Sequence, residues 1–100
     1  NIFHVNFNIL NFLMINIEDL KKKITYRANY RGTKEMDKLL GAFTKKYIND
    51  LDDNELTLLC KLLDYDDENL YKYNQGQGTE IIIEENKISL LFKSFIYKNE

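Results

Sequence analysis

Proline and tryptophan are absent from this 100-residue sequence, and cysteine and histidine occur once each. The lone cysteine, Cys60, cannot form a disulfide within the chain, which fits a reducing compartment. One cysteine and one histidine are too few for a zinc site built from these residue types. With 44% apolar residues, the chain has enough apolar surface for the core of one small domain.

The sequence also lacks the patterns that catalysis and phosphate binding require. Cys60 lies in a leucine-rich segment, where a small core residue is the expected role. Gly76 and Gly78 are not followed by the Lys-Ser/Thr pair of a P-loop. The acidic stretch 64–69, DYDDEN, has neither the glycine nor the terminal glutamate of an EF-hand, and we expect it to cap a helix. The sequence therefore predicts a protein that is not an enzyme, with no catalytic residue and no metal site.

Apolar residues recur at helical spacing along most of the chain. This pattern predicts an all-α fold, a compact bundle of about five short helices. We expect the first helix from about Ile17 to Asn29, with Asn16 as its N-cap. The second helix should begin just after Gly32, and it has the clearest apolar stripe: Met36, Leu39, Leu40, Phe43, Tyr47 and Ile48.

The later helices follow acidic or polar turns. Asp52 and Glu55 resemble a capping box and predict the start of a third helix, whose apolar face contains Leu56, Leu59 and Leu63. A short fourth helix should turn three side chains inward: Leu70, Tyr71 and Tyr73. The β-branched run 79–83, TEIII, has no strand to pair with, so we interpret it as an extended lead-in to a fifth helix. The inward residues of that helix are expected to be Ile88, Leu91, Phe92, Phe95 and Ile96.

Residues 1–13 contain no lysine or arginine, so they match neither a secretory signal nor a mitochondrial transit peptide. They are also too short and too polar to span a bilayer, and no direct membrane insertion is expected. We interpret Met14 as the natural start and residues 1–13 as the product of an over-extended gene model; the alternative is a disordered or loosely docked extension. On this view residues 1–15 form a non-native or flexible extension, and residues 16–100 form a single helical domain.

Charge is unevenly distributed, although the net charge is only −2. Residues 17–48 contain nine Lys/Arg and four Asp/Glu (+5), residues 49–85 two and eleven (−9), and residues 86–100 three and one (+2). Such a chain is neither a globally basic nucleic-acid binder nor an acidic disordered tail. Seven cations of the first segment could form a basic patch: Lys21, Lys22, Lys23, Arg27, Arg31, Lys34 and Lys38. Because acidic residues are interspersed among them, the alternative is an ordinary solvated face.

The stretch 30–37, YRGTKEMD, places a glycine inside a helical pattern, where glycine costs about 0.5–1 kcal/mol relative to alanine. In a structural interpretation, Gly32 is the left-handed residue that ends the first helix, and an exposed Arg31–Glu35 pair adds little. In a functional interpretation, the stretch is a recognition surface.

Several segments together resemble the succinate dehydrogenase assembly factor 2 family, known in bacteria as SdhE. They are YRGTKEMD, a Leu/Phe helix, DLDDNEL, LLDYDDENLY and a final helix. The family signature Arg-Gly-x-x-Glu falls here on Arg31, Gly32 and Glu35, with the accompanying acidic residue at Asp37. The similarity runs from about residue 17 to residue 73, and the C-terminal quarter matches only as a helix.

The chain departs from the family pattern at three places. Tyr30 stands where the family often has a second arginine, Tyr73 where it usually has tryptophan, and Gly41-Ala42 where a proline is common. These departures leave the signature intact and affect the contacts around it.

The resemblance implies a small chaperone that binds the flavoprotein subunit of succinate dehydrogenase, and in some bacteria that of fumarate reductase. It implies that the chain promotes covalent attachment of FAD to a histidine of that subunit, so the FAD belongs to the client and no cofactor is bound stably here. A monomer in the bacterial cytoplasm, without a nucleic-acid partner, is expected. The partner-binding residues that it implies are Tyr30, Arg31, Gly32, Glu35 and Asp37.

Two other functions fit the composition. One is a small helical nucleic-acid-binding or regulatory module that uses the Lys21–Lys38 patch, whose affinity would fall steeply with ionic strength. The other is a structural protein that bridges subunits and has no role with flavin.

Overall fold

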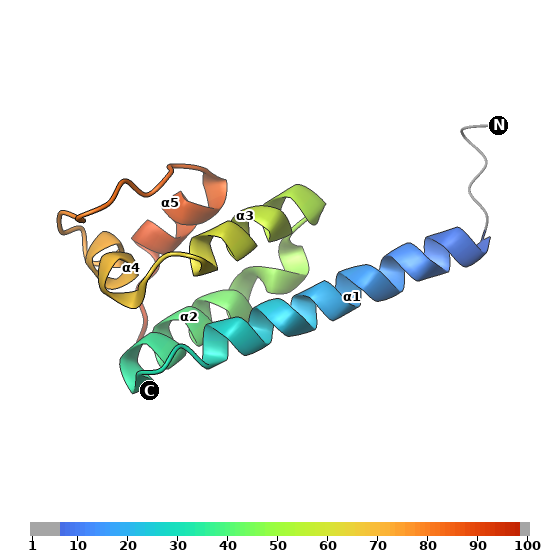
Figure 1. The fold of residues 1–100 in the computed structure, drawn as a ribbon, viewed down its shortest axis with the longest axis horizontal. Coiled ribbons are helices and arrows are strands. Elements are labelled where there is room, and N and C mark those ends of the chain that lie inside the picture. Colours follow the sequence, from blue (N-terminus) through green and yellow to red (C-terminus); the bar gives the residue numbers. More distant parts are fainter. Residues whose placement is uncertain (1–6, 99–100) are drawn as a thin grey trace.

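A computed structural model describes residues 7–98 of the chain, with side chains from residue 16 onward. Its helices, in chain order, are α1 (Phe7–Asn29), α2 (Lys34–Tyr47), the 3₁₀ turn η1 (Ile48–Asp50), α3 (Asp53–Leu63), α4 (Asp67–Asn74) and α5 (Lys87–Ser94). The described residues form no β-strand, which confirms the predicted all-α fold. Figure 1 shows α1 and α2 side by side. Helix α3 packs against α1, and α5 packs against α3 and α4.

Helix α1 begins earlier than the sequence predicted. Asn16 lies inside this helix and is not its N-cap, because helical backbone continues from Phe7 to Asn29 without a break. Residues 7–15 contain neither proline nor glycine, so nothing in their backbone chemistry stops a helix there. The division between an extension (1–15) and a domain (16–100) stays a prediction, and residues 1–6 lie outside the described residues.

Helix α2 begins where it was predicted to begin. Its N-cap is Thr33, whose hydroxyl oxygen accepts a hydrogen bond of 3.3 Å from the backbone N–H of Met36. Most of the predicted apolar stripe is buried, and Tyr47 is half-buried. Near the end of α1, a Cβ on the buried Gly41 would lie 2.4 Å from the side-chain Oδ1 of Asn29 but 4.0 Å from its Cα. A side chain at position 41 would therefore require the Asn29 amide to turn aside, whereas the Asn29 backbone is at an ordinary contact distance.

Helix α3 begins with the capping box that the sequence predicted. The Asp52 carboxylate accepts from the Glu55 N–H at 2.8 Å, and the Glu55 carboxylate accepts from the Asp52 N–H at 2.9 Å. Glu55 also forms an ion pair with Lys87, the first residue of α5. Its pKa is lowered, first by the Asp52 N–H and then by Lys87. One carboxylate thus caps α3 and joins it to α5.

The core is the union of the predicted helix faces. Phe43 and Leu59 are 1% and 0% exposed, as expected for its centre. The Phe43 ring lies 5.2 Å from that of Phe92 and 5.4 Å from that of Phe95, both in edge-on geometry. Asn74, at the end of α4, donates to the backbone carbonyls of Phe92 and Phe95 at 2.8 Å each. The end of α5 is thereby attached to α4.

Two residues that were predicted to face inward are exposed. Tyr71 is 44% exposed because Leu70 and Tyr73, three residues apart on α4, occupy the inward face. Ile96 is 77% exposed because α5 ends at Ser94, and in the extended chain that follows successive side chains point to opposite sides. The predictions that Tyr71 and Ile96 belong to the core are therefore wrong.

The predicted extended lead-in to α5 is confirmed, since residues 79–83 are neither helix nor strand. Ile83 is buried at 6% exposure and fixes this segment to the core. Ile82, directly before it, is 93% exposed.

Phe43→Ala should lower the free energy of unfolding by about 3–5 kcal/mol, because it removes a fully buried ring and leaves a cavity. Urea denaturation followed by circular dichroism measures this loss. Ile82→Ala is the matched control and should change stability by less than about 0.5 kcal/mol. Equal stability of the Phe43 variant and the wild type would contradict the assigned core.

Acid should destabilise the fold partly through Glu55. A folded-state pKa below the ordinary value gives stability that is present above the ordinary pKa and is lost as the pH falls through the folded pKa. Urea unfolding between about pH 6 and pH 3 should therefore show a shallower loss of stability for Glu55→Gln than for the wild type. Glu85→Gln, an exposed substitution, should leave the profile unchanged.

Candidate functional site

The signature residues lie in and beside the link between α1 and α2, residues 30–33. Gly32 has a φ of +118°, in the region that favours glycine. Gly32 was predicted to be the residue that ends α1, and this is wrong. Helix α1 stops at Asn29, and Gly32 lies in the middle of the link. No atom lies within 4 Å of the position that a Cβ would occupy there. The backbone angle thus requires glycine, and the surface beside it is open.

Asp37 fixes the conformation of this link. Its Oδ1 accepts hydrogen bonds from the backbone N–H groups of Arg31 and Gly32, the second at 3.3 Å. Asp37 lies in the first turn of α2, where a carboxylate is also favoured by the helix dipole. The carboxylate of this predicted partner-binding residue is therefore directed at the chain's own backbone.

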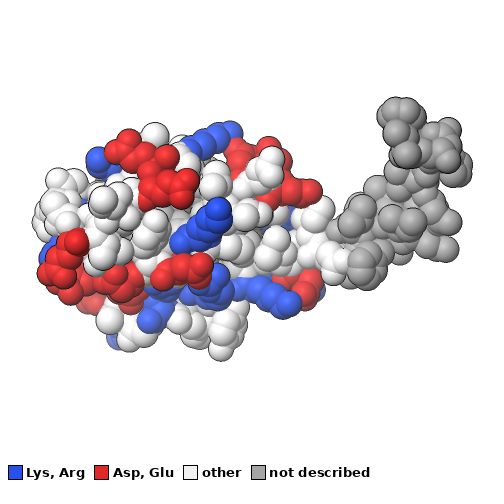
Figure 2. Space-filling view, turned by 45° about the horizontal axis from the view of Figure 1, so that its top comes forward, with Lys and Arg blue, Asp and Glu red and all other residues white. Residues whose placement is uncertain are grey.

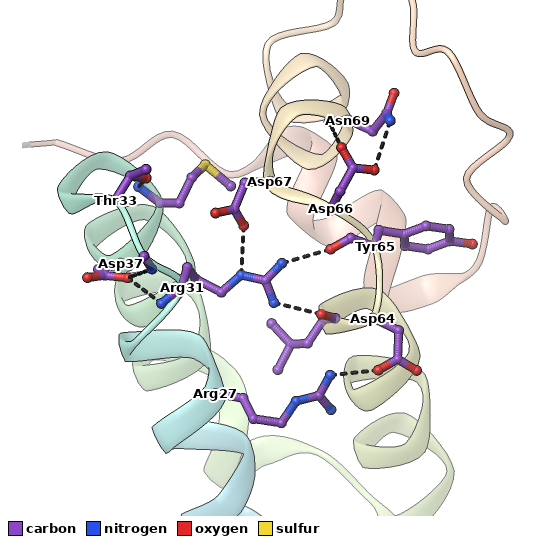
Figure 3. A network of polar contacts seen from close by, with 12 residues as sticks. Arg27, Arg31, Thr33, Asp37, Asp64, Tyr65, Asp66, Asp67 and Asn69 are labelled. Atoms are coloured by element: carbon purple, nitrogen blue, oxygen red, sulfur yellow. Dashed lines mark hydrogen bonds and ion pairs between the residues drawn. The ribbon is translucent and has the colours of Figure 1, made fainter.

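Arg31 points into the protein, and the prediction of an exposed side chain is wrong. Its side chain is 12% exposed. Nε donates to the Asp67 carboxylate at 2.8 Å, and the two terminal nitrogens donate to the backbone carbonyls of Leu63 and Tyr65 at 2.6 and 2.7 Å (Figure 3). A helix leaves its last carbonyls without partners, and a guanidinium satisfies them well. Arg31 therefore ties the link to the joint between α3 and α4, and it does not pair with Glu35.

The same joint receives a second arginine and its own helix cap. Arg27 donates to Asp64 at 2.6 Å, but this pair is exposed and contributes little stability. Asp66 caps α4 by accepting from the backbone N–H of Asn69 at 3.2 Å, which confirms the predicted capping role of residues 64–69. Hydrogen bonds from the side chain and backbone of Asn69 lower the pKa of Asp66.

The remaining signature residues face outward. Tyr30 is 69% exposed, and its ring lies 4.6 Å from that of Tyr26, which is 66% exposed. Glu35 is exposed and has no hydrogen bond or ion pair from its side chain to any described residue. The predicted site therefore divides in two. Arg31 and Asp37 hold the link from within, whereas the other three predicted residues face solvent.

Residues 22–95 match a family model described as "Flavinator of succinate dehydrogenase". The chain belongs to the flavinator family. This is a family of assembly factors and not of catalytic enzymes. The match confirms the resemblance inferred from the sequence, and it extends to residue 95, through all of α5. No curated protein and no solved structure matches the chain.

The sequence did not predict the partners of Arg31. Asp67 was expected only to cap a helix, and the carbonyls of Leu63 and Tyr65 carry no signal in a sequence. The one available signal was the opposite charge of residues 17–48 and 49–85. Both arginine–aspartate pairs join these two segments.

The predicted basic patch is largely neutralised. Four of its seven cations pair with carboxylates among the described residues: Lys21 with Glu18, Lys23 with Asp19, Arg27 with Asp64 and Arg31 with Asp67. Figure 2 shows basic and acidic side chains interspersed over the face in view. The face in view therefore has no continuous basic surface.

Cys60 is half-buried beside the core, and burial raises the pKa of its thiol, which disfavours the reactive thiolate. Over the described residues, no cluster of three or more His, Cys, Asp or Glu side chains could hold a metal ion. Within the same part of the chain, no helix has the length and apolar character needed to cross a membrane.

Arg31→Ala should lower the free energy of unfolding by about 2–3 kcal/mol, because it leaves a half-buried carboxylate and two carbonyls without their charged donor. Arg31→Lys should recover only part of the loss, since one ammonium cannot reach all three acceptors in the geometry of a guanidinium. Urea denaturation provides the measurement. Lys34→Ala, at an exposed neighbouring position, is the control, and an equally small effect at Arg31 would contradict the anchoring role.

Proposed function

We propose that this chain binds the flavoprotein subunit of succinate dehydrogenase and promotes the covalent attachment of FAD to that subunit. The membership of residues 22–95 in the flavinator family is the observation that carries the proposal. A fumarate reductase flavoprotein is a second client of the same kind. The encounter takes place in the bacterial cytoplasm, with this chain as a monomer.

The client surface that we propose is centred on Tyr30, Gly32 and Glu35. Gly32 presents backbone without a side chain, so a client can approach it closely. The Glu35 carboxylate has no partner among the described residues and is available to donors on the client. Tyr30 supplies a rigid, amphipathic ring next to them.

The anchors beneath this surface support its role in binding. Arg31 and Asp37 fix the link by five hydrogen bonds in all, so the client need not order it on binding. The signature in this proposal thus has two parts, an internal arginine that sets the shape and an external glutamate that contacts the client.

The chain contributes no reacting group in this proposal. The flavin and a histidine of the client supply the chemistry of the covalent bond. Binding of this chain favours the client conformation in which those two groups meet, and a factor that binds one conformation better shifts the population toward it. No FAD is bound stably by the chain itself.

Glu35→Ala tests the proposed surface without disturbing the fold. Because Glu35 is exposed and unpaired among the described residues, the variant should keep its stability within about 0.5 kcal/mol. In cells that carry only this variant, covalent flavin on the succinate dehydrogenase flavoprotein subunit should be strongly reduced in in-gel fluorescence. Glu85→Ala removes an exposed glutamate elsewhere and should behave as the wild type.

Normal flavinylation with normal amounts of the Glu35 variant would remove Glu35 from the surface. A strain without the chain gives the test of the function itself. If its flavoprotein subunit carries the full amount of covalent flavin, the chain is not a flavinylation factor, even if the two proteins copurify.

A further inference from the structure

A hollow of about 600 Å³ lies beside Glu35, between α2, α4 and the chain that follows α5. The segment after α5, residues 95–97, runs toward the beginning of α2, which brings these three segments together (Figure 1). The volume of the hollow is within the range of about 300–1,000 Å³ that is usual for ligand sites. Of the three outward-facing signature residues, only Glu35 lines it.

The walls of this hollow expose apolar side chains that the fold leaves without a partner. Ile96 is 77% exposed and Tyr71 is 44% exposed, and both line it together with Phe95 and Tyr97. A single exposed isoleucine or tyrosine is ordinary on a protein surface. Two of them in one concave site, over further apolar residues, are typical of an interaction surface.

The charges around the hollow are mainly positive. Lys38 and Lys93 line it, and neither forms an ion pair with a described carboxylate. The Lys93 ammonium lies 5.3 Å from the centre of the Tyr73 ring. Among the lining residues Glu35 is the one carboxylate. A segment that combines a large apolar side chain with an acidic residue is complementary to such a site.

The hollow also continues toward the signature. Glu35 and Tyr71 line both this hollow and a smaller, shallow one of about 330 Å³, whose other walls are Thr33, Met36, Asp67 and Glu68. A partner in contact with Glu35 can therefore extend into the larger hollow without leaving the surface.

We propose that the larger hollow is a docking groove for an extended segment of the flavoprotein client, in which a large apolar side chain stands next to an acidic residue. The apolar side chain packs on Ile96 and Tyr71, and the carboxylate lies near Lys38 and Lys93. That the segment belongs to the flavoprotein rests on the proposed function, whereas the chemistry of the segment follows from the groove.

The first experiment needs no knowledge of the client. The full chain is immobilised and a phage-displayed library of random 12-residue peptides is selected on it. Peptides that combine acidic and large apolar residues should be enriched, and a synthetic copy should bind less tightly as salt is added. Ile96→Ser and Lys38→Glu should each lower the affinity for that peptide by about tenfold or more, since each removes a direct contact.

Matched controls separate the groove from general effects. Ile82→Ser removes an isoleucine that is 93% exposed outside the groove, and Lys45→Glu reverses an exposed charge elsewhere on α2. Both should bind the peptide as the wild type does. Enrichment of peptides without acidic residues, no enrichment at all, or equal losses in variants and controls would each overturn the groove.

The second experiment measures the affinity of the same variants for the purified apo flavoprotein subunit by calorimetry. Weaker binding of Ile96→Ser and Lys38→Glu, with unchanged controls, supports the full proposal. Wild-type affinity in both groove variants overturns it while leaving the proposed function in place. If the flavoprotein does not bind the wild type but the selected peptide binds in the groove, the proposed function fails and the assignment of the segment to the flavoprotein fails with it, while the chemistry of the groove is supported.

Discussion

The guanidinium of Arg31 joins parts of the chain that are more than thirty residues apart. The guanidinium satisfies the carbonyl of Leu63 at the end of α3, that of Tyr65 in the turn after it, and the carboxylate of Asp67 at the start of α4. The backbone N–H of Arg31 donates to Asp37 at the start of α2. Four of the five α-helices of residues 7–98 therefore meet around one side chain and its neighbours. Because the link is fixed in this way, Gly32 and Glu35 are held in one orientation toward solvent. The arrangement explains how a signature of so few residues can determine both a shape and a surface.

The uneven distribution of charge along the chain is related to the same contacts, because ion pairs join the oppositely charged segments. A positive segment followed by a negative one suggests a molecule that orients on a charged partner, but part of the opposite charge is paired within the protein. The Arg27–Asp64 and Arg31–Asp67 pairs join the two segments, and Glu55–Lys87 joins the negative segment to the positive C-terminal one. The cations left over include Lys38 and Lys93, which line the same hollow. What a partner meets is the remainder after internal pairing, and a count along the sequence does not give that remainder.

Local signals predicted most of the fold. The stripe of α2 and the capping box of Asp52 and Glu55 depend on residues three or four apart, so the sequence contains all the information they need. Predictions that depended on distant parts of the chain were less successful. The direction of Arg31 is set by carbonyls at the end of another helix, and the exposure of Ile96 by the residue at which α5 stops. The position of the site was predictable from its motif, but its division into anchors and contacts was not.

The two hydrogen bonds from Asn74 to the end of α5 have a consequence for dynamics. They connect one wall of the hollow to a helix of eight residues that is joined to α4 by a long non-helical segment. Such a short element is expected to detach locally more often than the α1–α2 pair, and its amide hydrogens should exchange with solvent at a lower free-energy cost. Each detachment would remove Phe95 and Ile96 from the hollow together. An occupied hollow would therefore slow exchange throughout α5, including at amides that no partner touches.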